Sequence, residues 1–362
     1  MRPLVSDTPS ASHHNNFDFL RFLLATSVLL YHCYPLLYGD ASPRGGLAAS
    51  LAGAGAGNAV NFFFVISGFL ITDSWMRTQN LVRFLQKRVL RIYPAFVLAS
   101  LFCVFVAGPL GTQNVHEYWQ HFHVVKFLFY LPLLPADVVG PDMSLVFTHL
   151  NFPALINGSF WTLRYEFEFY LLVALFGLLG LFRHPIIVLG ILSLLFIVPI
   201  SFVHNHEFPW VGNPARWLRL SVYFLSGMTF YLYRSRIPYS PVAYALGLAV
   251  ICAGVWISWL NALSPILGVY ALLCVAFDPR IKLQRFARYG DFSYGIYVFA
   301  FPIQQVLIQH FGNRLTALSL FAYAFSLTLL LAVASWYGVE KPFLQLKPRQ
   351  AGKMAPSAER GE

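Results

Sequence analysis

The sequence predicts an all-α fold, a polytopic transmembrane helical bundle of about ten spans with both termini on the cytoplasmic side (N-in and C-in). Hydrophobic residues make up 57% of the 362 residues and charged residues only 11%, and the mean hydropathy is +0.61. Apolar runs of span length recur along the whole chain, and most of its basic residues lie in the connections between them. These three features are typical of a multi-pass membrane protein.

Ten apolar segments, taken in order, are the predicted spans. They lie at about residues 17–37, 59–75, 92–107, 159–182, 186–202, 217–233, 242–260, 263–277, 292–309 and 315–337. A Gly/Ala-rich connection precedes the second span. Residues 109–158 are irregular and broken by prolines, and we expect an external segment with a re-entrant or interfacial piece there. The predicted domains are a disordered cytoplasmic N-terminus (1–16), one membrane domain (17–343) and a cytoplasmic tail (344–362).

The distribution of Lys and Arg sets the predicted orientation. With both termini inside, 18 of the 25 basic residues fall on the cytoplasmic side and 6 on the outer side, with Arg21 in the first span. Cytoplasmic loops carry such an excess of positive charge. The net charge of +10 therefore reflects topology. We do not expect a nucleic-acid partner, because the basic residues form no single patch.

Ionisable residues inside apolar spans are the candidate functional residues, because placing them in a bilayer is costly. The first span contains Arg21 and His32, about 16 Å apart along one helix. Glu166 lies about 10 Å into the fourth span, at a depth that it could share with His32. A carboxylate that orients a histidine helps the ring to accept a proton from a hydroxyl. His32 and Glu166 are therefore the predicted catalytic pair, whereas Glu168 is expected to pair with an arginine.

Arg88 and Arg91, at the start of the third span, are the candidate anion-binding residues. Their i, i+3 spacing places both guanidinium groups on one face of a helix, where they could bind phosphate in a bidentate manner. The alternative is that they only set topology and contact anionic lipid. No Walker-type or Rossmann glycine motif is present. The histidines and cysteines show no metal-binding spacing, so no metal is expected.

Five motifs occur in order between residues 17 and 343: FDFLRFLLATSVLLYH, FFFVISGFLIT, KRVLRIYP, SFWTLRYEFEFYLL and GDFSYGIYVFAFPIQQ. Together they resemble the motifs of integral-membrane acyltransferase family 3, whose members typically O-acylate sugars of bacterial lipopolysaccharides, exopolysaccharides and nodulation factors. Arg21 and His32 match the family's Arg-x10-His, Arg88 and Arg91 match its Arg-x-x-Arg, and Glu166 matches its carboxylate.

The resemblance implies a multi-pass enzyme of the bacterial inner membrane that uses acetyl-CoA as donor and a glycan or lipid-linked saccharide as acceptor. Arg88 and Arg91, with Arg21 further in, would bind the phosphates of CoA. His32, oriented by Glu166, would deprotonate a hydroxyl that arrives from the periplasmic side.

The chain departs from the family pattern at three positions. Ala300 stands where many members have a histidine, Thr162 replaces a serine, and Phe167 replaces a frequent second acidic residue. Ala300 is therefore given no chemical role, and a two-carboxylate mechanism lacks its second group.

Two alternatives stay open. Transfer could pass through a transient acyl-enzyme, although the sequence offers no decisive nucleophile. The chain could instead be a transporter or flippase that moves a glycolipid or an acyl group, with the buried His, Arg and Glu as a relay.

Overall fold

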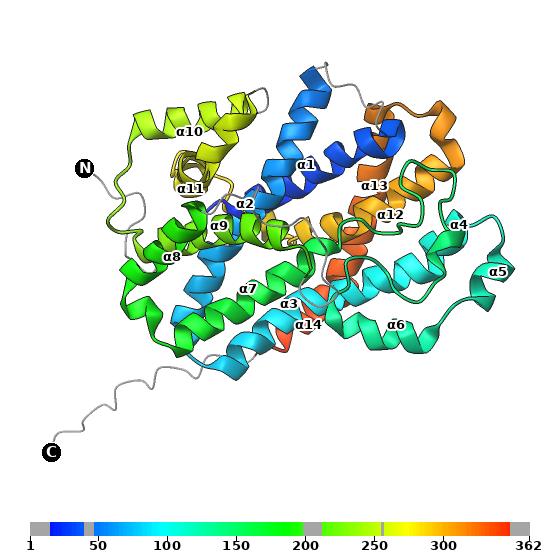
Figure 1. Ribbon diagram of the computed structural model, residues 1–362, viewed down its shortest axis with the longest axis horizontal. Helices are drawn as coiled ribbons and strands as arrows, with labels where there is room; N and C mark the ends of the chain where they lie inside the picture. The colour runs from blue at the N-terminus through cyan, green and yellow to red at the C-terminus, as the bar shows by residue number, and fades with distance from the viewer. Residues whose placement is uncertain (1–14, 40–46, 198–211, 255–256, 348–362) are drawn as a thin grey trace.

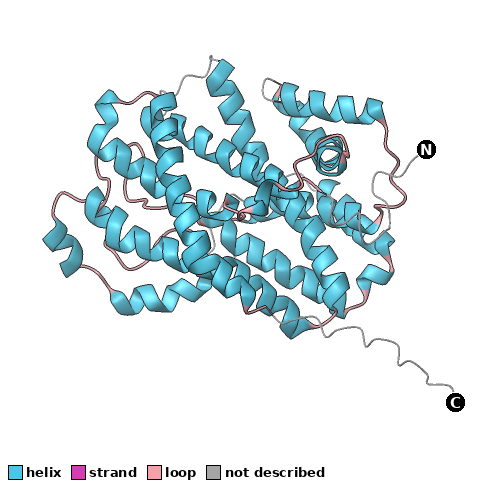
Figure 2. Ribbon diagram, turned by 180° about the vertical axis from the view of Figure 1, so that it is seen from behind, coloured by secondary structure: helices cyan, strands magenta, loops and turns pink. Residues whose placement is uncertain are grey.

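The computed structural model describes residues 15–39, 47–197, 212–254 and 257–347 of the chain. These residues form helices joined by loops and contain no strand (Figure 1 and Figure 2), which confirms the all-α prediction. The longer helices are α1 (Phe17–Tyr38), α2 (Leu47–Thr78), α3 (Leu81–Phe102), α7 (Trp161–Leu178), α8 (Pro185–Ile197), α9 (Pro214–Leu232), α10 (Pro241–Ala253), α11 (Val269–Phe277), α12 (Ser293–Phe311) and α13 (Ala317–Ser335).

Short helical pieces extend or connect these helices. Two π-helical turns, Cys103–Ala107 and Trp336–Glu340, continue α3 into α4 (Gly108–Gly111) and α13 into α14 (Lys341–Gln345). A third, Ser264–Gly268, precedes α11. In the region that the sequence predicts to be external, α5 (Val115–Gln120) and α6 (Val124–Tyr130) lie at the opposite end of the molecule from α10 and α11 (Figure 1).

Each of the ten predicted spans overlaps a helix, although residues 198–202 and 255–256 of two of them lie outside the described residues. Among the described residues, five helices are long and apolar enough to cross a membrane. These are Phe17–Tyr38, Asn58–Thr78, Leu81–Gly111, Leu260–Phe277 and Ala317–Gln345. The helix α10 has 13 residues, about 20 Å, which is shorter than a bilayer core of about 30 Å, and α8 is described over 13 residues, up to the end of a described range at Ile197. Several apolar helices make the chain a multi-pass membrane protein, whereas the number ten and the orientation stay predictions.

The structure differs from the sequence expectation at three boundaries. The Gly/Ala-rich connection is helical from Leu47 onward, because Ala and Leu favour the helix. Asn16, within the predicted disordered N-terminus, is buried, and its side chain donates to the carbonyl of Val275 and accepts from the amide of Leu283. In the predicted tail, α14 continues to Gln345. Residues 1–14 and 348–362 of the two predicted terminal segments lie outside the described residues.

Contacts between helices bring the ends of four segments together. Arg21 near the start of α1 pairs with Asp291 just before α12, and His32, further along α1, packs on Phe301 of α12, so the two helices run parallel. Arg91 near the start of α3 pairs with Asp291 and with Glu340 at the end of the α13 extension. All four segments belong to the side that the sequence predicts to be cytoplasmic.

The helices α2 and α9 cross at two glycines. A Cβ atom on Gly68 would lie 2.0 Å from the carbonyl oxygen of Phe224, and one on Gly227 would lie 2.0 Å from the carbonyl oxygen of Val65. No side chain fits at such distances, so only glycine permits this approach of the two backbones. Gly68 belongs to the FFFVISGFLIT motif.

Asp137 organises the loop that leads into α7. Its carboxylate accepts hydrogen bonds from the backbone amides of Val138, Ile156 and Asn157, at 2.7, 3.0 and 2.7 Å. Burial raises the pKa of Asp137 to about 6, against the effect of these three amide donors. The Asn157 side chain in turn donates to the carbonyl of Val298 on α12. The start of α7 is thereby fixed against α12.

Candidate active site

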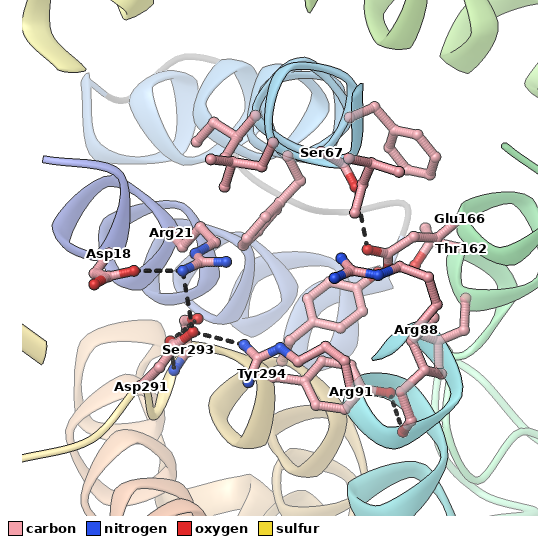
Figure 3. Close-up of a pocket in the computed structure, with 18 of the residues that line it drawn as sticks. Asp18, Arg21, Ser67, Arg88, Arg91, Thr162, Glu166, Asp291, Ser293 and Tyr294 are labelled. Atoms are coloured by element: carbon pink, nitrogen blue, oxygen red, sulfur yellow. Dashed lines mark hydrogen bonds and ion pairs between the residues drawn. The ribbon is translucent and has the colours of Figure 1, made fainter. Parts of the chain in front are cut away.

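A cavity of about 460 Å³ lies between α1, α2, α3, α7, α12 and the C-terminal end of the described chain (Figure 3). Its charged and polar lining residues are Asp18, Arg21, Ser67, Arg88, Arg91, Thr162, Glu166, Tyr170, Asp291, Ser293, Tyr294, Tyr297 and Lys347. The cavity thus brings together four of the five predicted site residues, which come from three helices.

One wall of the cavity is a single face of α2. Val60, Phe63, Phe64, Ser67 and Leu70 line it with helical spacing. This face is apolar except for Ser67, whereas the guanidinium groups project from α1 and α3 on the other side (Figure 3). The cavity therefore offers a charged surface and an apolar surface to the same ligand.

Asp291 is the central carboxylate of the charged surface. It pairs with Arg91 at 2.6 Å and with Arg21 at 3.3 Å, and it accepts a hydrogen bond from the Ser293 amide at 3.2 Å. Arg21 also pairs with Asp18. Burial alone would raise the pKa of Asp291, but the two guanidinium groups and the Ser293 hydrogen bonds outweigh it and hold the pKa well below its ordinary value. Asp291 is therefore ionised and partly neutralises both arginines.

Arg88 differs from Arg91 although both lie on one face of α3. Within the described residues, Arg88 forms no ion pair, and its one hydrogen bond is to the Ser74 hydroxyl at 3.4 Å. Its guanidinium lies over the rings of Phe84 and Tyr170, at 5.8 and 5.7 Å, and its Nε is buried with no hydrogen-bond partner among those residues. Arg88 is thus a largely desolvated cation that faces the cavity and forms no ion pair in the described residues, although the Glu166 carboxylate is close enough to attract it.

Glu166 faces the cavity from α7. Its carboxylate accepts hydrogen bonds from the hydroxyls of Ser67, at 3.3 Å, and Tyr170. Glu168, two residues later, pairs with Arg164 at 2.9 Å, which confirms the expected structural role of Glu168. One turn before Glu166, Thr162 hydrogen-bonds Tyr297 of α12 at 2.6 Å between their hydroxyl oxygens.

His32 lies outside the lining of this cavity. Its ring packs edge-on against Phe301, with centroids 5.2 Å apart, and its Nδ1 atom is buried without a hydrogen-bond partner in the described part of the chain. Phe301 is one helical turn beyond Tyr297, which lines the cavity. His32 and Glu166 form no hydrogen bond in this structure, so the expected orientation of the histidine by Glu166 is not present in it.

Three charged residues of the cavity, Asp18, Asp291 and Lys347, were not among the predicted site residues. Asp291 lies in the GDFSYG motif two residues before Ser293, and its partner Arg91 is 200 positions away. Lys347 lies in the segment that was expected to be a tail. For Asp291, the local signal was an acidic residue beside the start of a helix. Acidic residues are common at this position, so the pattern does not by itself indicate a functional site.

The arrangement suits an elongated amphipathic ligand with an anionic group. Guanidinium groups at one side can bind phosphate, and the α2 face can contact an apolar chain. The hydrogen-bonded hydroxyls of Thr162 and Tyr297 also line the cavity, one helical turn of α12 before Phe301, the residue that packs on His32.

Comparison with known proteins agrees with this geometry. The family described as "Acyltransferase domain" matches residues 14–337. An "O-acetyl transferase" of Shigella phage Sf6 is 32% identical over 344 residues, covering 91% of this chain and 96% of the relative. "Nodulation protein 10" of Rhizobium leguminosarum bv. viciae is 26% identical over 383 residues, covering 94% of this chain and 96% of the relative.

A shorter match is to "Acyltransferase MdmB" of Streptomyces mycarofaciens, which is 31% identical over 120 residues, 31% of this chain and 26% of the relative. No solved structure matches the chain. Because the family match covers nearly all of the described helices, including every segment that carries Arg21, His32, Arg88, Arg91 and Glu166, the chain belongs to acyltransferase family 3 and is an acyltransferase.

Proposed function

We propose that this protein is an O-acetyltransferase of the bacterial inner membrane that transfers the acetyl group of acetyl-CoA to a hydroxyl of a cell-envelope or extracellular glycan. The observation that carries the proposal is the cavity in which three arginines of family motifs meet an apolar helix face. The relative named as an O-acetyl transferase, which matches over 91% of this chain, supports acetyl as the group transferred to oxygen.

In this mechanism the phosphates of acetyl-CoA bind at Arg88 and Arg91, with Arg21 deeper in the cavity. Arg88 has the strongest reason to bind an anion, because it is partly buried, its Nε has no hydrogen-bond partner and it forms no ion pair in the described residues. The pantetheine arm follows the apolar face of α2 and carries the thioester toward Thr162 and Tyr297.

The chemical step joins the acceptor oxygen to the acetyl carbonyl carbon. His32 takes the proton of the acceptor hydroxyl, the oxygen attacks the thioester carbonyl, and the carbon–sulfur bond breaks to release CoA as a thiolate that then takes up a proton. The buried Nδ1 of His32 accepts and donates no hydrogen bond among the described residues, which leaves this nitrogen available for the proton transfer. Phe301 packs on His32, and Tyr297, one turn earlier on α12, lines the cavity, so we expect the acceptor and the thioester to meet near these two rings.

The test uses membrane vesicles with their cytoplasmic face outward. Acetyl-CoA labelled in the acetyl group is supplied outside, and the label is followed into membrane glycans, with vesicles that lack the protein as control. The proposal expects protein-dependent incorporation of label together with release of free CoA. Movement of a glycolipid or an acyl group without covalent incorporation would instead support a transporter.

A further inference from the structure

The C-terminal end of the described chain forms part of the cavity wall. The π-helical turn Trp336–Glu340 continues α13 into α14, which packs against α3. Three residues of this segment, Trp336, Leu344 and Lys347, line the cavity beside the arginines. The tail predicted from the sequence is therefore continuous with the candidate donor site.

Lys347 is the fourth cation of the cavity. Arg21 and Arg91 are both paired with Asp291, at 3.3 and 2.6 Å. Over the described ranges, Arg88 and Lys347 form no ion pair. The cavity thus combines two arginines that are paired with Asp291 and two cations that form no ion pair in those ranges, although Glu166 acts on Arg88 from a longer distance.

The surroundings of Lys347 are unfavourable for an isolated ammonium. Burial, reinforced by the nearby charges of Arg88, Arg91, Lys87 and Arg21, lowers the pKa of Lys347 to about 8. Like charges that converge on one cavity are stabilised when an anion binds between them. A group with two negative charges, such as a phosphate monoester or a diphosphate, can accept hydrogen bonds from both Arg88 and Lys347.

We propose that Lys347 is a donor-binding residue, whose ammonium lies with Arg88 on the same cavity and completes the binding site for a phosphate group of the acyl-CoA. This inference rests on the proposed function and extends it to a residue outside the family motifs. Lys347 contributes to affinity for the donor and has no part in the transfer of the acyl group.

Binding measured on the purified full-length protein in lipid nanodiscs tests this role. Lys347→Gln should weaken CoA binding by about tenfold, the effect of losing one charge-assisted hydrogen bond. Binding of pantetheine, which has no phosphate, should not change, and kcat for acetyl transfer should stay at the wild-type value while KM for acetyl-CoA rises. Lys347→Arg keeps the charge and should restore most of the affinity.

Lys341→Gln is the matched control. Lys341 is an exposed lysine of the same segment, lies over the ring of Tyr337 at 5.2 Å and does not line the cavity. Loss of charge at Lys341 should leave CoA affinity unchanged, which separates a local contact from the general positive charge of this end of the protein.

The pH dependence of binding gives a second readout. The groups around Lys347 are the cations Arg21, Lys87, Arg88 and Arg91, and the carboxylates Asp18, Glu166 and Asp291 line the same cavity. As pH rises through about 8, Lys347 loses its proton, so wild-type affinity for CoA should fall. In Lys347→Arg the side chain stays charged, and this fall should disappear.

The outcomes separate this inference from the proposed function. Wild-type protein that binds CoA no more tightly than pantetheine would overturn both. The role of Lys347 alone would be overturned by either of two results, given wild-type protein that binds CoA through its phosphates. In the first, Lys347→Gln binds CoA as tightly as wild type. In the second, Lys341→Gln weakens CoA binding as much as Lys347→Gln does.

Discussion

Arg88 and Arg91 have the same side chain and lie three residues apart, but their surroundings give them different roles. Arg91 forms ion pairs with Asp291 at 2.6 Å and with Glu340 at 3.8 Å, so its charge is already partly neutralised inside the protein. Arg88 has aromatic rings and one hydroxyl as neighbours. Arg88 should therefore contribute more to anion binding, and Arg91 more to the assembly of the cavity.

Arg88→Lys tests this difference. Lysine keeps the positive charge but lacks the planar guanidinium group with its five N–H donors, so CoA affinity, measured by calorimetric titration, should fall by about tenfold. Arg83→Lys, at an exposed position earlier on α3, should have no effect. If Arg88→Lys bound CoA as wild type does, Arg88 would serve membrane topology only.

Asp291→Asn tests the central carboxylate. Without it, the buried guanidinium groups of Arg21 and Arg91 lose their shared partner, and the free energy of unfolding should fall by about 3 kcal/mol. Thermal unfolding in detergent measures the change, with Asp278→Asn as control because Asp278 forms no ion pair in the described chain. Equal melting temperatures for the two variants would show that Asp291 does not stabilise the charged surface.

At the scale of single residues, the sequence predicted the cavity arginines well and their partners poorly. We could predict Arg21, Arg88 and Arg91 because it costs free energy to place a charge in or next to an apolar span. Such a charge in the sequence therefore indicates a function. Glu166 was expected beside His32 but bonds Ser67 and Tyr170. Spacing along a helix gives depth in the membrane, whereas the direction in which a side chain points depends on the rotation and tilt of the helix.

Among the secondary-structure elements, the crossing of α2 and α9 determines where Ser67 and the apolar cavity wall lie. Gly68 is adjacent to Ser67, and its backbone touches Phe224 across the crossing. Gly68→Ala should force the helices apart and lower the free energy of unfolding by about 2 kcal/mol or more.

Gly190→Ala is the control for the crossing. Gly190 lies within α8, and a Cβ there would meet nothing within 4 Å. Alanine should stabilise this helix by a few tenths of a kcal/mol to about 1 kcal/mol. Both variants are compared by thermal unfolding in detergent, and a neutral Gly68→Ala would mean that the crossing can relax without cost.

The loop before α7 should respond to pH through Asp137. Its pKa is raised to about 6 in the folded protein from an ordinary value of 3.8, so the folded state holds this proton more tightly than the unfolded state does. The contribution of Asp137 to stability is therefore fully present below pH 3.8 and is lost as pH rises through about 6.

Asp137→Asn removes this titration while keeping an acceptor oxygen for the loop amides. Between pH 4 and 7, at about equal ionic strength, the melting temperature of wild type should fall relative to that of the variant. Parallel curves for the two proteins would show that Asp137 does not titrate in this range.

The whole molecule was predictable in class and in the positions of its helices, because apolar runs separated by polar connections carry that information directly. The number of spans stays a prediction, because α7 carries three charged residues and α10 has only 13 residues. Such helices can lie within the bundle by packing on their neighbours. Their charges are then satisfied by other helices, as with Arg164 and Glu168 or Glu166 and Ser67.

The cavity is a property of the whole fold, since residues from positions 18 to 347 line it. Contacts over such separations have no periodic or local signature in one sequence. The predicted boundary between the membrane domain and the tail, at residue 344, assigned Lys347 to the tail, whereas its side chain lines the cavity of the membrane domain.

The most direct test of the account is mass spectrometry of cell-envelope and secreted glycans from a strain that lacks this protein. The strain is complemented with wild type, His32→Ala or Arg88→Ala, each shown to reach the membrane in equal amount. The account predicts that one acetyl group per modified sugar is lost in the deletion strain, returns with wild type, and does not return with His32→Ala. Full acetylation in the deletion strain, or its restoration by His32→Ala, would contradict the account.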